Sequence, residues 1–182
     1  MKCFKLAIAS TFVASIVSFN SMADNTGSID FIGSVVNTPC NIEQSSLKQT
    51  VDFGQLSRKA LEGGNVAEAD FDIKFTGCDF NNFDKDTEGK PVAVKTMQLV
   101  FTGQNYADDK NTLLATSVGN ANNLGIAIDG FEFGKAKNVL PNGNKQDDIT
   151  LTFKALAKAV DASKDVAEGK FSAISNFRIT YQ

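Results

Sequence analysis

The feature that most restricts the fold of this chain is a series of short segments in which apolar and polar residues alternate. Alternation with a period of two places the apolar side chains on one face of a β-strand. Such segments occupy residues 27–35, 71–75, 97–101, 126–128 and 177–181. Stretches rich in Gly, Asn and Asp separate them, at residues 61–65, 78–91, 103–111, 119–123 and 141–148. Several short alternating strands joined by turns predict an all-β sandwich.

One longer segment, residues 151–166, is open to two interpretations. Leu156 and Val160 have the i, i+4 spacing of an amphipathic helix. The same segment also alternates, through Leu151, Phe153 and Ala155, and its first residues are β-branched or aromatic. The strand is the favoured interpretation, and the helix remains the alternative.

The N-terminal segment, residues 1–23, has the three parts of a secretory signal peptide. Lys2 and Lys5 make its start positive, a short apolar run covers residues 6–17, and small residues at 21 and 23 suit a signal peptidase that cuts before residue 24. A membrane anchor would need about 20 apolar residues, and this run has about a dozen. We therefore expect an exported mature chain, residues 24–182, without a membrane span.

Charge and composition exclude several kinds of function. The chain has no His, and its formal net charge is −3. Without imidazole there can be no histidine metal site and no Ser-His or Cys-His dyad. A nucleic-acid-binding protein would normally show a basic patch or a high pI. We therefore expect no nucleic-acid partner.

Two cysteines, Cys40 and Cys78, remain after removal of the signal peptide. An even pair in an exported chain predicts a disulfide, because the compartment beyond the inner membrane is oxidising. Closing the loop between them would be worth roughly 4 kcal/mol in the chain-entropy model. Two buried free thiols are the alternative.

Two segments begin like known motifs but lack required residues. Residues 84–89 resemble the start of an EF-hand calcium loop, yet Lys95 stands where the bidentate acid is needed. Residues 130–135 resemble a phosphate-binding loop with one spacer residue too few, and Phe131 and Phe133 are expected to pack into a sheet. No pair of carboxylates is selected as general acid and base. We expect no enzyme activity, no metal and no cofactor.

The two ends of the mature chain carry more specific patterns, at residues 27–40 and 169–182. Gly169 is fourteenth from the C-terminus and Tyr181 is penultimate. Further patterns follow in order at residues 51–54, 75–78, 100–103 and 123–126. Together they resemble the structural subunits of type 1-like chaperone–usher fimbriae over essentially the whole mature chain.

The resemblance implies an incomplete immunoglobulin-like β-sandwich, the pilin fold, over residues 37–182. Such a domain lacks its last strand, and the N-terminal extension of a neighbouring subunit supplies it. Here the extension would be residues 24–36, with Ile29, Phe31 and Val35 entering the neighbour's groove and Gly33 at a crowded crossing point. The alternative is that residues 28–35 form the chain's own first strand.

The resemblance also implies partners and a location. The C-terminal strand would border the groove and pair with a strand lent by a periplasmic chaperone, through Gly169, Phe171, Phe177, Ile179 and Tyr181. An outer-membrane usher and identical or related pilin subunits would be the other partners. The product would be a fimbria on the surface of a Gram-negative bacterium, exported through the periplasm and supporting cell adhesion. A secreted, self-contained β-sandwich binding module is the alternative function.

Overall fold

The computed structural model describes residues 27–141 and 146–182. The predicted signal peptide, residues 1–23, and the first three residues of the predicted extension lie outside the described residues. The chain divides into two units between Val35 and Val36. In the first unit, the described residues 27–35 contain no helix or strand. Among the helices of the described part, none is long and apolar enough to cross a membrane.

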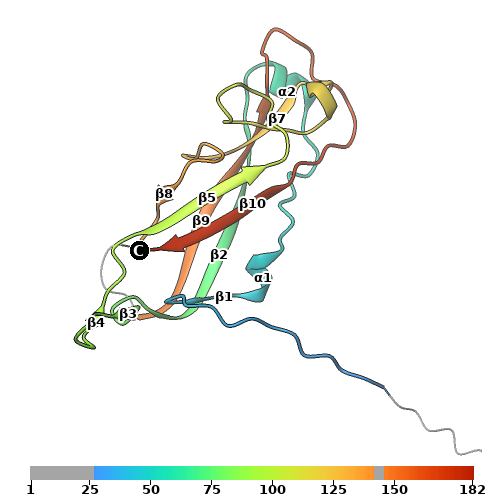
Figure 1. Ribbon diagram of the computed structural model, residues 1–182. Helices are drawn as coiled ribbons and strands as arrows, with labels where there is room; N and C mark the ends of the chain where they lie inside the picture. Colours follow the sequence, from blue (N-terminus) through green and yellow to red (C-terminus); the bar gives the residue numbers. More distant parts are fainter. Residues whose placement is uncertain (1–26, 142–145) are drawn as a thin grey trace, which may run out of the picture. The chain divides into compact units, whose positions relative to one another are not determined.

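The second unit is built from two antiparallel sheets and a small hairpin (Figure 1). The larger sheet has the order β1-β2-β9-β7-β6, with the bounds Asn41–Ile42, Ala67–Asp79, Gln146–Ala159, Leu124–Ile128 and Leu114–Ala115. The smaller sheet has the order β10-β5-β8, with the bounds Ser175–Tyr181, Met97–Gly103 and Lys137–Asn138. The hairpin consists of β3 (Asp84–Lys85) and β4 (Pro91–Val92). The prediction of an all-β sandwich is confirmed.

Three short helical segments connect the strands, namely α1 (Gln44–Leu47), α2 (Arg58–Glu62) and the 3-10 turn η1 (Val118–Asn120). At the start of α2, the Ser57 hydroxyl accepts a hydrogen bond from the Ala60 N–H, and Gly63 ends the helix. Ser before a helix and Gly after it are the usual caps. Leu61 and Glu62, the first residues of the turn expected at 61–65, therefore belong to a helix that was not predicted from the sequence.

The core lies between the sheets and follows the predicted alternation. Ile73 and Phe75 of β2 and Leu99 of β5 are at most 1% exposed. Phe71, Phe101, Phe131 and Phe153 contact one another through their rings, with centroids 5.0 to 6.1 Å apart. Edge-to-face geometry, as between Phe101 and Phe153, is a favourable arrangement for aromatic pairs.

The ambiguous segment 151–166 is a strand in its first half only, because β9 ends at Ala159. Asn123 fixes the turn that follows. Its side-chain amide donates to the carbonyls of Asp161 and Lys164, both at 2.9 Å, and its side-chain oxygen accepts from the Asp161 N–H at 2.9 Å. These hydrogen bonds hold the chain away from the sheet beyond residue 160.

Phe131 and Phe133 lie in the connection between β7 and β8 and in neither strand, but Phe131 packs, as expected, against Phe101 of β5 and Phe153 of β9. Both nevertheless pack on the core, and Phe133 is 3% exposed. The EF-hand-like segment forms the β3–β4 hairpin, where the Asp86 carboxylate accepts hydrogen bonds from the N–H groups of Glu88 and Lys90. This carboxylate stabilises a turn, as Asp side chains commonly do.

The structure joins Cys40 and Cys78 in a disulfide, as the sequence predicts. Cys40 precedes β1, and Cys78 lies near the end of β2, the strand with which β1 pairs. Both cysteines are 4% exposed. Because β1 contributes only two residues of pairing, the disulfide is a main tie between the start of the domain and the larger sheet.

Candidate functional site

The smaller sheet ends at β10, which has a neighbouring strand on one side only. β10 pairs with β5 throughout its length. The apolar residues of the two strands lie directly opposite one another, in the pairs Phe177–Phe101, Ile179–Leu99 and Tyr181–Met97. These pairs lie on the core face of the sheet.

The burial of the two strands differs sharply. On β5, Met97, Leu99 and Phe101 are 0 to 2% exposed. On β10, the three opposing side chains are only half-buried, although they pack against the same core. In the described part of the chain, no strand lies beyond β10 to cover their outer flank. A strip of apolar surface therefore runs along this strand.

The backbone of β10 is open along the same side. Gln182 and Thr96 exchange two hydrogen bonds, at 2.9 and 3.0 Å. In an antiparallel ladder such pairs alternate with residues whose N–H and C=O groups point the other way. The groups of Phe177, Ile179 and Tyr181 therefore point away from β5. Among the described residues, none of these groups has a hydrogen-bond partner. We call these three residues, with their outward-facing backbone groups, the β10 edge.

The segment before β10 extends the apolar surface. Phe171 is half-buried, and its ring centroid lies 6.2 Å from that of Phe53 in the segment between α1 and α2. Gly169 has a φ of +134°, a conformation that side-chain-bearing residues rarely adopt. Phe53 was not identified from the sequence as a site residue, although the alternation of residues 51–54 was a usable signal.

Tyr181 keeps the C-terminal end of the β10 edge uncharged. Burial raises the pKa of its hydroxyl to about 12, so the phenol is neutral at any physiological pH. Its ring also lies 6.3 Å from that of Phe83, measured between centroids. The three side chains of the edge therefore carry no charge.

The predicted donor residues lie in the other unit of the chain. Ile29 and Phe31 are 79% and 90% exposed, and Val35 is fully exposed. A Cβ added at Gly33 would meet no atom within 4 Å. Contiguous exposed apolar side chains of this kind are typical of interaction sites.

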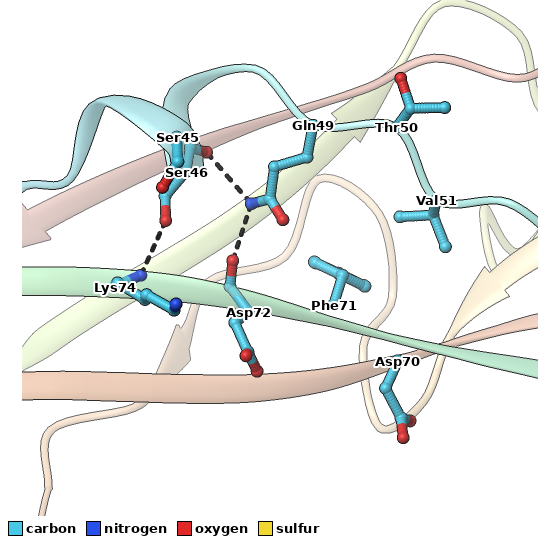
Figure 2. A pocket seen from close by; sticks show the side chains of 9 residues that line it. All are labelled: Ser45, Ser46, Gln49, Thr50, Val51, Asp70, Phe71, Asp72 and Lys74. Atoms are coloured by element: carbon cyan, nitrogen blue, oxygen red, sulfur yellow. Dashed lines mark hydrogen bonds between the residues drawn. The ribbon is translucent and has the colours of Figure 1, made fainter.

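The outer edge of β2 differs from the β10 edge (Figure 2). Beside it lies an open, mostly polar pocket of about 300 Å³. The Ser46 hydroxyl accepts a hydrogen bond from the Lys74 N–H at 3.0 Å, and the Gln49 side chain donates to the Asp72 carbonyl at 2.7 Å. The Asp72 side chain points to the other side of β2, where its carboxylate accepts a hydrogen bond from the Thr152 hydroxyl of β9 at 2.7 Å. Because an edge whose backbone groups are already hydrogen-bonded resists strand addition, the β10 edge is the better candidate for a docking site.

Known fimbrial proteins are similar to this chain over nearly its whole length. The family model for fimbrial proteins matches residues 29–182. The KS71A fimbrillin of Escherichia coli is 37% identical over 191 aligned positions, covering 98% of this chain and 99% of that protein. The Pap fimbrial major pilin protein of Escherichia coli is 36% identical, with the same two shares covered.

Solved structures give the same result. A subunit in the structure of a chaperone–usher pilus superposes with a TM-score of 0.69 at 34% identity, covering 87% of this chain and 96% of that chain. The P pilus rod subunit PapA superposes with a TM-score of 0.64 at 35% identity, covering 80% of this chain and all of that chain. With its β-sandwich, its disulfide and this similarity over nearly its whole length, the chain belongs to the fimbrial protein family and is a structural subunit of a fimbria.

Proposed function

We propose that this subunit polymerises by donor-strand exchange, in which the extension of one subunit, residues 24–36, adds as a strand to the β10 edge of the next. The observation that carries the proposal is the half-burial of Phe177, Ile179 and Tyr181 beside backbone groups that have no partner among the described residues. Strand addition to an exposed edge uses main-chain hydrogen bonds for affinity and alternate side chains for specificity.

The extension has the pattern that such an edge requires. Ile29, Phe31 and Val35 alternate with other residues, so an extended backbone directs all three to the same face. Burying three side chains of this kind is worth roughly 5–9 kcal/mol before the cost of ordering the segment. Gly33 lies between two of them and allows close approach of the two chains.

An unpaired edge with apolar side chains promotes aggregation before assembly. We expect a periplasmic chaperone to cover the β10 edge by lending a strand, and Gly169 and Phe171 to border the site. An outer-membrane usher would then pass the subunit to the cell surface of a Gram-negative bacterium. The fibre would support cell adhesion as a structural element, and the subunit would have no catalytic role. The open edge favours this proposal over a self-contained binding module.

Hydrogen exchange of individual backbone N–H groups tests the proposal. In the fibre, the N–H groups of Ile179 and Tyr181 should exchange much more slowly than in freshly refolded, unassembled subunits, because the donor strand accepts their hydrogen bonds. Arg178 and Thr180 serve as internal controls, since their N–H groups face β5 and should be protected in both states. NMR after dissolving the exchanged fibres gives both sets of rates. Equal rates for Ile179 and Tyr181 in the two states would refute docking at the β10 edge.

A further inference from the structure

We infer that Asp30 of one subunit forms a charge pair with Arg178 of the next subunit in the fibre, and that this pair sets the register of the inserted strand. The inference rests on the proposed donor-strand exchange. It adds a specificity-determining contact to a surface that is otherwise apolar.

From Gly27 to Val36 and on β10, the charges are single and opposite. Asp30 is the only charged residue from Gly27 to Val36. Arg178 is the only charged residue of β10. Apolar side chains in a regular alternation can dock in several positions shifted by two residues, because each shift keeps the same face inward. A single opposite-charge pair distinguishes these positions.

Alternation places both charges on the outer face of the completed sheet. Arg178 lies between Phe177 and Ile179, which pack on the core, and it is exposed. Asp30 lies between Ile29 and Phe31, the side chains proposed to enter the core. If these two turn inward, Asp30 turns outward, to the same side as Arg178.

Arg178 is available for this contact. Its guanidinium forms no ion pair or hydrogen bond with any of the described residues.

The geometry selects one register. All strand pairings in the described domain are antiparallel, and a strand that continues this pattern runs antiparallel to β10. With Phe31 opposite Phe177, Asp30 lies directly opposite Arg178, at a Cβ separation of about 5 Å. A shift by two residues in either direction sets Asp30 opposite an uncharged residue, Asn176 or Thr180.

A charge-reversal cycle in the mature chain tests the pair. Asp30→Lys and Arg178→Glu should each speed the dissociation of fibres in denaturant by about three- to tenfold, and the double variant should return to within about twofold of the unaltered chain. Raising the salt to about 1 M should shrink the effects of both single variants. Lys110→Glu reverses an exposed charge in the turn after β5, away from the β10 edge, and should have little effect. If the two single effects multiply in the double variant, the pair does not exist.

Cross-linking reads the register directly. Asp30 and Arg178 would lie opposite one another without sharing backbone hydrogen bonds. In an antiparallel ladder, the Cα atoms of such a pair are about 4.5 Å apart, within the range that a disulfide spans. Asp30→Cys combined with Arg178→Cys should therefore give a ladder of linked subunits, and Asp30→Cys combined with Thr180→Cys should not. Faster linkage of the second combination would overturn the register.

The substitution Phe31→Asp separates failure of the charge pair from failure of donor-strand exchange. If Phe31→Asp leaves the fibres intact, donor-strand exchange itself is refuted. If Phe31→Asp blocks fibre formation and the charge-reversal variants show no coupling, only the charge pair is refuted.

Discussion

Replacing Phe31 with Asp is expected to abolish fibre growth. Burying a Phe side chain contributes about 1.5–3 kcal/mol, and an ionised carboxylate in its place is buried without a partner, which costs several kcal/mol more. Every junction of the fibre would carry the same defect, so the losses repeat along the chain of subunits. Electron microscopy and sedimentation of purified subunits after assembly measure the result.

The neighbouring residue provides a matched control. Ile32 is 96% exposed in the structure, similar to Phe31 at 90%, and differs from it chiefly in the face it occupies on an extended strand. Ile32→Asp should therefore still assemble. If both substitutions block assembly equally, the alternation of the extension does not govern docking. If neither does, the extension is not the donor strand.

Removal of the disulfide has the second large expected effect. Replacing Cys40 and Cys78 together with Ser should lower the free energy of unfolding by roughly 4 kcal/mol, because the 38-residue loop is no longer closed in the unfolded chain. The two sulfurs are nearly buried, so the Ser hydroxyls also lose hydration in the folded domain. Urea denaturation measures the change on a chain that begins at Asn37 and carries residues 24–36 after Gln182, which we expect to stay monomeric.

Reduction of the unaltered chain is the control for this substitution. Reduction opens the same loop without introducing hydroxyl groups. The free energies of unfolding of the oxidised and reduced chains should therefore differ by about as much as the substitution changes this free energy, minus the part that comes from burying Ser. A difference below about 1 kcal/mol would contradict a main stabilising role for the bond.

The strands that could be predicted are those whose alternation is local and apolar. Residues 71–75, 97–101, 126–128 and 177–181 all lie within observed strands. The start of β2 was missed, because exposed acidic residues such as Glu68 and Asp70 alternate there with small ones and leave only a weak apolar pattern. The helix α2 was missed although Ser57 and Gly63 carried a capping signal, because five residues are too few for a clear helical period.

The candidate site, too, could be predicted from the sequence only in part. Phe177, Ile179 and Tyr181 could be identified from the sequence because they alternate and close the chain. Their half-burial could not, because it depends on which strand is the last of its sheet, and strand order is a long-range property of the fold. The contact between Phe53 and Phe171 joins segments more than a hundred residues apart for the same reason.

Thermal unfolding and size of two chains test most directly whether the sandwich lacks a strand that the extension supplies. One is the mature chain, residues 24–182. The other begins at Asn37 and carries residues 24–36 again after Gln182, joined by a flexible Gly/Ser linker. We predict a stable, cooperative monomer from the second chain, and polymers or aggregates from the first. If the first is already a stable monomer and the added segment changes nothing, the sandwich is complete and donor-strand exchange is wrong for this subunit.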